Sequence, residues 1–340
     1  MRKPQQIKIW PEIISYIPAL IHIKTDVKKV DRIIVDFSNC WQLDASGLNI
    51  LLGSLLTMKA SVHYQDAIWE IPTSSMKLTI KNDLILLGFF SHFKERLPES
   101  PDLNLFGNEI EDVSYESLKP RIQEVGTGAV VYSYPLYKLD FGKYDDRREA
   151  FNEVLADFKG WLRNIFNSFK EYNITKNELL LILKEIIKNS ADHTEDNAYF
   201  AIDIREEKLG PQKKKMEINF SFMDFGKGIY RTIWDFISEE LKQKRIPKRS
   251  ITEAYHKALQ MGFSTKTGSK NNMGLGMSII TEGAKGIDLN LSVFDAQSRG
   301  VLTSIQGNSH AEIRRHFFDT GSSVNFFYYG RICFEGKNGN

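Results

Sequence analysis

The sequence lacks the features of a secreted or membrane-spanning protein. Its only two cysteines, Cys40 and Cys333, are far apart and lack metal-ligand spacing, which suits a reducing compartment and predicts no zinc site. The longest apolar runs, such as residues 84–90, are far below the roughly 20 residues that a membrane helix requires. The N-terminus has no unbroken apolar segment and no small-residue cleavage site, which argues against a signal peptide. We therefore expect a soluble cytoplasmic protein with no membrane partner.

An excess of charge of one sign is also absent. Lys and Arg total 45 and Asp and Glu total 43, which leaves a formal net charge of +2. This balance gives no electrostatic reason to expect nucleic acid as a partner. What the chain does contain is 42% hydrophobic residues in 340, enough for a sizeable core, and this length favours two domains over one.

Alternating strand and helix patterns predict an α/β fold. A segment rich in Pro, Gly and acidic residues predicts a linker at 111–128, between domains at 1–110 and 129–340. In the first domain, apolar periodicity predicts strands at 31–37 and 67–72 and helices at 48–60 and 74–93. In the second domain it predicts strands at 129–139, 198–207, 215–225, 289–296, 301–307 and 323–335, and helices at 147–172, 175–193, 229–243, 251–261 and 274–284.

The predicted helix at 175–193 carries polar residues at helical spacing. Thr175 and Glu178 have the spacing of a capping box, which fixes the helix start. Glu185, Asn189 and Asp192 follow four and three residues apart, so they lie along one stripe on successive turns. Apolar residues flank this stripe, namely Leu180, Leu181, Leu183, Ile186 and Ile187.

Two interpretations of the stripe are open. It is either the solvent-facing side of an amphipathic helix or the wall of a site. In a site, the carboxylate of Glu185 takes a proton from a nucleophile, and the amide oxygen of Asn189 binds a hard cation such as Mg²⁺. A Glu and an Asn four residues apart occur about once by chance in such a composition, so spacing alone favours the surface interpretation.

The second motif is "MDFGKGI", where Asp224, Gly226 and Gly228 follow a strand pattern and precede a helix pattern. Two glycines allow the backbone to approach a flat ligand closely, and a buried Asp accepts a hydrogen bond from an exocyclic amine. The alternative interpretation is an ordinary strand-to-helix turn.

The third motif is "GFSTKTGSKNNMGLGMSII", residues 262–280. Its first half is small, polar and basic, as expected of a loop that closes over a ligand. Lys266 and Lys270 could contact phosphate there or face solvent. In its second half, Gly274, Leu275 and Gly276 begin a helix, where free backbone N–H groups and the helix dipole favour a phosphate.

In order, "EIIKNSADH", "DFGKG", "STKTGSKNNMGLGMSI" and "GSSVNFF" resemble the N box, the G1 box, the ATP lid with the G2 box, and the G3 box of the GHKL ATPases and kinases. The resemblance spans about 130–340. It implies an α/β sandwich with a mixed sheet backed by helices, and the cofactors ATP and Mg²⁺.

The resemblance also implies a role for each matched residue. Glu185 would be the general base and Asn189 the Mg²⁺ ligand. Asp192 would support the nucleotide pocket, and Asp224 would receive the adenine amine. The remaining matches imply that Gly226 and Gly228 shape the adenine pocket, that Lys266, Gly274, Leu275 and Gly276 lie at the phosphates, and that Ser322 stands where the family usually has a Thr near adenine.

The stretch "IIVDFSNCWQLDASGLNILLGSL" resembles the STAS domain of anti-sigma factor antagonists, in which the serine before the glycine accepts a phosphate. That position corresponds to Ser46. A local interpretation is equally open, with Asp44 as a helix N-cap and Ser46 in the first helical turn.

The two resemblances imply a regulatory switch with a regulatory protein as partner and a possible homodimer. The predicted helix at 147–172 contains no histidine, which disfavours a histidine kinase, and the early end after the G3 box disfavours a clamp ATPase. We expect Glu185 to activate water or a serine for attack on the γ-phosphate of ATP. The alternative is a nucleotide-gated binding module with negligible turnover.

Overall fold

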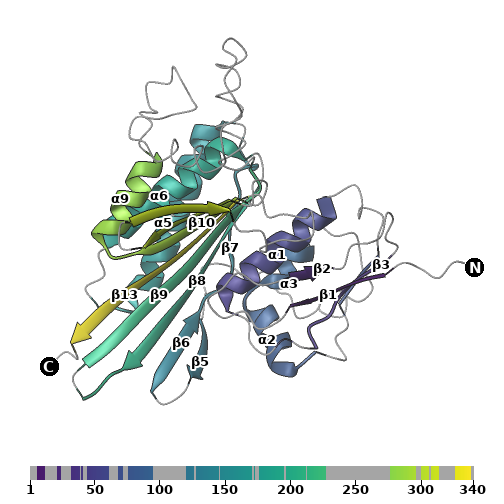
Figure 1. The fold of residues 1–340 in the computed structure, drawn as a ribbon, viewed down its shortest axis with the longest axis horizontal. Coiled ribbons are helices and arrows are strands. Elements are labelled where there is room, and N and C mark those ends of the chain that lie inside the picture. The colour runs from purple at the N-terminus through teal and green to yellow at the C-terminus, as the bar shows by residue number, and fades with distance from the viewer. Residues whose placement is uncertain are drawn as a thin grey trace, which may run out of the picture.

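The structure is a computed structural model with an α/β architecture, in which two separate sheets are covered by helices (Figure 1). Among the helices in the described parts of the chain, none is both long and apolar enough to span a bilayer. The structure describes residues 6–11, 21–23, 32–38, 40, 44–60, 68–71, 76–94, 120–125, 128–144, 146–170, 172, 176–194, 197–211, 213–226, 276–295, 300–305, 308–313 and 326–337.

The described residues between 6 and 94 form an N-terminal unit with a four-stranded sheet in the order β2-β1-β3-β4. Strands β1, β3 and β4 are parallel, and β2 pairs antiparallel with β1. The predicted helix at 74–93 is divided in two at Gly88, whose φ of 73° interrupts the helical backbone. The elements are β1 (Gln6–Pro11), β2 (Ile21–Ile23), β3 (Arg32–Val35), α1 (Ala45–Ala60), β4 (Ile68–Glu70), α2 (Leu78–Leu86) and α3 (Phe89–Lys94).

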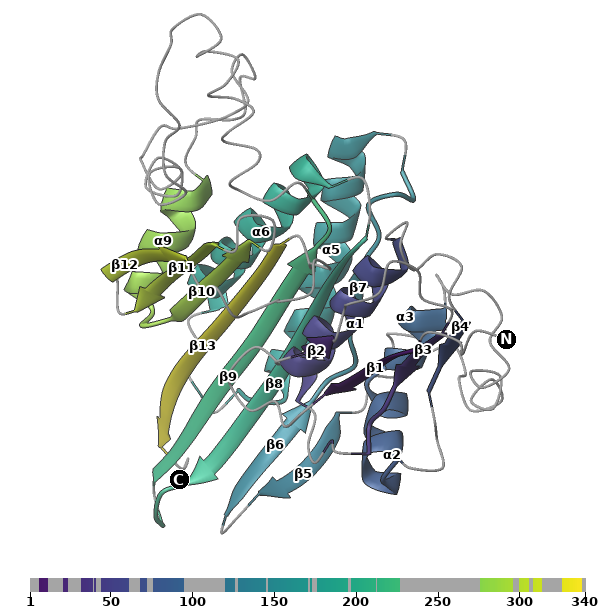
Figure 2. The ribbon, with the colours of Figure 1, turned by 45° about the vertical axis from the view of Figure 1, so that its right-hand side comes forward.

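The second sheet has nine strands in the order β12-β11-β10-β13-β9-β8-β6-β5, with β7 also paired to β8. Figure 2 shows its long central strands crossing the molecule. The strands are β5 (Arg121–Val125), β6 (Ala129–Ser133), β7 (Tyr137–Leu139), β8 (Ala198–Lys208), β9 (Lys213–Asp224), β10 (Asn290–Asp295), β11 (Gly300–Ile305), β12 (Asn308–Ile313) and β13 (Phe326–Lys337).

The expectation of a mixed sheet in this region was wrong for the described strands, because all their pairings are antiparallel. The physical reason is that at most four residues separate the strands in each of the pairs β5–β6, β8–β9, β10–β11 and β11–β12, and a connection this short can join only antiparallel neighbours. The predicted strand at 129–139 is two strands, β6 and β7. Strand β5 lies within the segment that we interpreted as a linker, 111–128, and pairs with β6.

Three helices cover one face of the large sheet, which we call the inner face (Figures 1 and 2). They are α5 (Arg147–Asn167), α6 (Lys176–His193) and α9 (Gly276–Gly286). Asp146 caps α5 by accepting hydrogen bonds from the backbone N–H groups of Arg148 and Glu149, which lower the pKa of its carboxyl. Phe158 and Trp161 of α5 pack edge-on against Phe200 of β8, in an aromatic core that excludes water.

The opposite, outer face of the sheet receives helix α1 of the N-terminal unit. Helix α1 is apolar around most of its circumference, as expected for a helix buried between two layers. Asp44 begins it, because its Oδ1 accepts a hydrogen bond of 2.6 Å from the N–H of Gly47 and its carbonyl accepts the first helical bond, from Leu48. The N-cap interpretation of Asp44 is therefore confirmed. The buried apolar residues of α1 are Leu48, Leu51, Leu52, Leu55 and Leu56.

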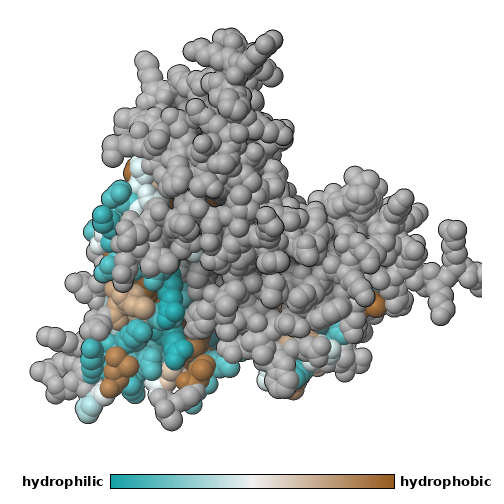
Figure 3. Space-filling view, in the orientation of Figure 1, coloured by the Kyte–Doolittle hydropathy of each residue, from teal (hydrophilic) through white to brown (hydrophobic). Residues whose placement is uncertain are grey.

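Beyond the helices, β8 and β9 continue to their connecting hairpin. Lys208 and Lys213 are exposed at this end, and Lys214 lies 3.8 Å from the carboxylate of Glu206. Figure 3 shows hydrophilic residues over much of this part of the surface, with smaller apolar patches between them. The far ends of the strands are thus solvated, whereas their other ends lead to the residues that the sequence motifs single out.

Candidate functional site

Helix α6 presents the predicted polar stripe at its second half. Glu185 is only 8% exposed, while Asn189 and Asp192 are half-buried. Among the residues that the structure describes, no hydrogen bond or ion pair engages the carboxylate of Glu185. Its oxygens are not among the fully buried polar atoms without a hydrogen-bond partner, so this mostly buried side chain keeps a carboxylate that solvent can reach.

The apolar surroundings of the stripe differ from expectation at one residue. Ile186 and Ile187 are fully buried and Leu183 nearly so, as predicted for the core side of the helix. Leu181, however, is 46% exposed, because it lies on the side of α6 that faces away from the sheet. The stripe is therefore bordered by the core on one side and by solvent on the other, which leaves it accessible.

Asp224 is the last residue of β9 and is 4% exposed. Its Oδ2 accepts a short hydrogen bond from the Ser190 hydroxyl of α6, and its Oδ1 accepts one of 2.9 Å from the N–H of Gly226. These two hydrogen bonds, one to each oxygen, hold the carboxylate in place. The first and second sequence motifs thus meet at this residue.

Gly226 is required by the close approach of the two motifs. A Cβ atom at this position would lie 2.9 Å from the carbonyl oxygen of His193 and 3.2 Å from Oδ1 of Asp224. Neither atom can move away easily, because one belongs to the backbone at the end of α6 and the other to a carboxylate that accepts a hydrogen bond at each of its oxygens. The turn after β9 therefore packs directly on the end of α6 only with glycine here.

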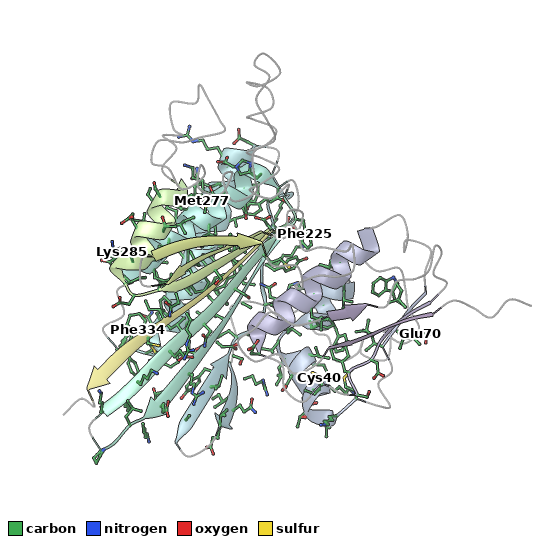
Figure 4. The ribbon with its side chains drawn as sticks, in the orientation of Figure 1. Cys40, Glu70, Phe225, Met277, Lys285 and Phe334 are labelled. Carbon is green, nitrogen blue, oxygen red and sulfur yellow. The ribbon has the colours of Figure 1, made fainter. Side chains whose placement is uncertain are left out.

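Helix α9 brings the third motif to the same helix. It begins at Gly276, and the next residue is Met277, which Figure 4 labels. The sulfur of Met277 lies 3.9 Å from Nδ2 of Asn189. Further along, a Cβ on Gly283 would lie 2.9 Å from Cγ1 of Ile182, which shows how closely α9 approaches α6. The first turn of α9 therefore lies beside Asn189.

Several predicted residues lie outside the described residues. These are Thr175, Gly228, Lys266, Lys270, Gly274, Leu275 and Ser322, together with the helices predicted at 229–243 and 251–261. The backbone of Ser46 lies in the first turn of α1. Ser46 is therefore on the outer side of the sheet, whereas α6 with Glu185 is on the inner side.

Two residues of this region were not predicted from the sequence. Ser190 is fully buried and holds Asp224, and Met277 contacts Asn189. A signal for Ser190 was available, because it follows Ile186 and Ile187 by four and three residues and so falls on the buried stripe of α6. A hydroxyl on a buried stripe must find a polar partner, which here is Asp224.

The donor set can be compared with the needs of Mg²⁺ and a nucleotide. Within the described ranges, no group of three or more His, Cys, Asp or Glu could hold a metal ion by itself. Mg²⁺ at nucleotide sites commonly uses one or two protein oxygens together with phosphate oxygens and water. The amide of Asn189, beside the buried Glu185 and the start of α9, fits that pattern.

Comparison with known proteins gave no relative. No family model matches the chain, and neither the curated proteins nor the solved structures include a significant match.

Proposed function

We propose that the chain is a Mg²⁺-dependent ATP-binding protein of the GHKL type, which hydrolyses ATP or transfers its γ-phosphate to a serine as a regulatory switch. The observation that carries the proposal is the meeting of Asp224 with α6. Two motifs more than thirty residues apart in the sequence are joined by the hydrogen bond from Ser190 to Asp224, and the helix involved also presents Glu185 and Asn189.

The adenine would be received by the carboxylate of Asp224. Ser190 and Gly226 hold this carboxylate, so it needs no reorganisation to accept a hydrogen bond from the exocyclic amine. Gly226 lets this turn pack on the end of α6, since a Cβ there would lie 2.9 Å from the carbonyl oxygen of His193.

The phosphates would lie toward the first turn of α9 and Asn189. Backbone N–H groups at the start of α9 would donate to phosphate oxygens, and the amide oxygen of Asn189 would bind Mg²⁺. The unpaired carboxylate of Glu185, one turn earlier on α6, would take the proton of the attacking hydroxyl. Mg²⁺ would balance charge on the phosphate oxygens.

The acceptor of the phosphate is water or a serine. In the N-terminal unit, which we propose to be STAS-like, Ser46 lies on the outer face of the sheet, while Glu185 lies on a helix of the inner face. Transfer to Ser46 within one chain would require the N-terminal unit to leave the sheet. This arrangement favours water, or a serine of a second chain or a regulatory partner.

The test is incubation of the full chain with Mg²⁺ and ATP, followed by measurement of free phosphate and by mass spectrometry of the chain. We expect Glu185→Ala to lose at least about a hundredfold of the rate, since general bases contribute on the order of 10²–10⁴. Glu178→Ala, on the exposed first turn of the same helix, is the matched control and should leave the rate unchanged.

The outcomes separate the enzyme from a nucleotide-gated module. Free phosphate with an unmodified chain supports an ATPase, and phosphate on Ser46 supports a serine kinase. Tight binding of ATP with no turnover, and no effect of Glu185→Ala, would establish the module instead. No binding of ATP at millimolar concentration would contradict both.

A further inference from the structure

Helix α1 is fixed to the outer face of the sheet by one buried amide. Asn49 is fully buried, and its Nδ2 donates to the carbonyl of Tyr199 at 3.2 Å and to the hydroxyl of Ser221 at 3.0 Å. The carbonyl of Ser221 lies at 3.4 Å. Tyr199 belongs to β8 and Ser221 to β9, so a single side chain of the N-terminal unit bridges the two strands.

The bridge lies close to the candidate site along β9. Ser221 precedes Asp224 by three residues, about 10 Å of extended chain. Side chains alternate between faces, so Ser221 meets α1 on the outer face and Asp224 meets Ser190 on the inner face. The same short piece of strand is therefore held from both sides.

A second connection runs through three rings. The ring of His92, in α3, packs edge-on against Tyr199 with centroids 5.4 Å apart, and Tyr199 packs edge-on against Phe225 at 6.2 Å. His92 is itself positioned by a contact of 3.1 Å between its Nε2 and the carbonyl of Leu136. Figure 4 shows Phe225 at the end of the strands that faces the N-terminal unit.

Phe225 links these rings to the turn that holds the candidate ligand. Its backbone lies inside the turn that the N–H of Gly226 closes on Oδ1 of Asp224. Its ring points to the outer face, where it contacts Tyr199. A movement of the N-terminal unit away from the sheet would remove the support of Phe225 and of β9 together, and would loosen the turn.

We propose that the N-terminal unit, docked through Asn49 and His92, is an intramolecular regulator that positions the Asp224–Gly226 turn for its ligand. The proposal rests on the proposed function, because the ligand is taken to be a nucleotide. Docked and released states of the N-terminal unit are the two states of the switch. Ligand binding and docking then stabilise one another, because coupling between two sites is reciprocal.

The experiment uses the full chain and a non-hydrolysable ATP analogue with Mg²⁺. Asn49→Leu removes the amide at similar volume. We expect it to weaken binding of the analogue about five- to tenfold, a typical size for coupling between sites, and to speed hydrogen exchange at 219–226 without the analogue. Asn82→Leu, the same substitution at an exposed position of α2, is the matched control and should change neither quantity.

A reciprocal measurement in the wild-type chain separates regulation from a merely structural role. The analogue should slow hydrogen exchange in α1, although α1 lies on the face opposite the proposed site. This arm also remains decisive if Asn49→Leu does not fold. Binding of the analogue with no change of exchange in α1 would overturn the proposal, and so would equal affinity and equal exchange at 219–226 in Asn49→Leu.

The experiment distinguishes failure of the proposed function from failure of the regulatory proposal. If the wild-type chain does not bind the analogue, the nucleotide assignment fails, and docking is judged from exchange without ligand. Faster exchange at 219–226 in Asn49→Leu but not in Asn82→Leu would then support positioning of the turn, and equal exchange would overturn it.

Discussion

The two faces of β8 and β9 carry different chemistry on the same strands. On the inner face, Phe200, Ile202, Phe220 and Phe222 pack against α5 and α6 in a continuous apolar core. The outer face carries polar residues between its apolar ones, and the buried members include Asp203, Glu217, Asn219 and Ser221. Both faces are buried. The outer face meets its helix in mid-strand through the side-chain hydrogen bond from Asn49, whereas the inner face is apolar there and has its hydrogen bond to a helix, from Ser190 to Asp224, at the end of β9.

This difference indicates two roles. An apolar interface contributes stability in proportion to the area that it removes from water, but it specifies geometry poorly. A buried polar contact contributes little net stability, since its groups were hydrogen-bonded in water, but it penalises any wrong alignment. We therefore expect the inner face to hold the fold together and the outer face to set how the N-terminal unit is placed.

The largest change in the free energy of unfolding is expected for a substitution on the inner face. Phe158 is 1% exposed and packs against the rings of Tyr137, Trp161 and Phe200. Phe158→Ala should lower the free energy of unfolding by about 3–5 kcal/mol, through lost burial and a residual cavity. Ser221→Ala on the outer face should cost about 1 kcal/mol. Urea unfolding followed by circular dichroism measures both, and equal costs would contradict the distinction between the faces.

The next largest effect concerns the pH dependence of stability, to which Asp44 at the start of α1 contributes. Burial, together with the nearby charge of Asp203, raises the pKa of Asp44 to about 7, although the N–H of Gly47 opposes the shift. Between about 4 and about 7 the folded chain therefore holds a proton that the unfolded chain has lost. This contribution to stability is complete at low pH and is lost as pH rises through 7, by at most about 1.4 kcal/mol per pH unit.

Asp44→Asn is the variant that tests this slope. Asparagine keeps an acceptor for the N–H of Gly47 and is a good N-cap, but it does not titrate. Urea unfolding between pH 5 and pH 8 should show a shallower fall for Asp44→Asn than for the wild type, with Asp203→Asn between them. Burial also raises the pKa of Asp83, to about 6, and this contribution is common to all three chains. Identical slopes would contradict the assignment to Asp44.

The sequence predicted the inner face better than the outer one, for a physical reason. Apolar periodicity identifies a residue that is buried but not its partner, and this suffices for α5, α6, β8 and β9, whose bounds agree with prediction within a few residues. Asn49 belongs to an apolar helix pattern, and nothing local indicates that it meets strands 150 and 172 residues away. Tertiary contacts of that kind carry no periodic signal.

The residues of the candidate site were also predicted from the sequence only in part. Glu185, Asn189 and Asp224 were singled out by spacing and by the resemblance to GHKL motifs, and the structure places them on α6 and at the adjacent end of β9. Ser190 was not predicted, because it lies among the apolar residues of the buried side of α6, where periodicity indicates burial but not a polar partner. A polar residue at an apolar position is a signal of its own, and it leads directly to Asp224.

A smaller effect on stability is expected for Ser190, a polar residue that contacts Asp224 at the edge of the apolar inner face. Ser190→Ala removes the hydroxyl that donates to Oδ2 of Asp224, a carboxylate that is 4% exposed. We expect a cost of about 1.5–3 kcal/mol, because hydrogen bonds to charged groups contribute in that range. Binding of the ATP analogue should weaken as well, since the acceptor is less well positioned. The control is Ser168→Ala at the exposed end of α5, and similar behaviour of the two variants would contradict a special role for Ser190.

The smallest effect on stability is expected between the two helices of the inner face that border the proposed phosphate position. Gly283→Ala gains about 1 kcal/mol of helix propensity in α9. The new Cβ lies 2.9 Å from Cγ1 of Ile182 and 3.3 Å from its Cδ1, and overpacking of this kind costs on the order of 1–3 kcal/mol. Because Cγ1 lies in the middle of a fully buried side chain, we expect α9 itself to shift by a few tenths of an ångström, and the two contributions to offset one another in part.

Gly283→Ala should also affect the candidate site, because it increases the distance between α9 and α6. Pushing α9 away from α6 separates Met277 from Asn189 and moves the first turn of α9 away from the proposed Mg²⁺ ligand. We therefore expect Gly283→Ala to change the midpoint of urea unfolding little and to weaken binding of the ATP analogue several-fold. Gly286→Ala at the end of α9, where a Cβ meets nothing within 4 Å, is the matched control and should retain full affinity. Equal affinity of the two variants would mean that the start of α9 does not contribute to binding.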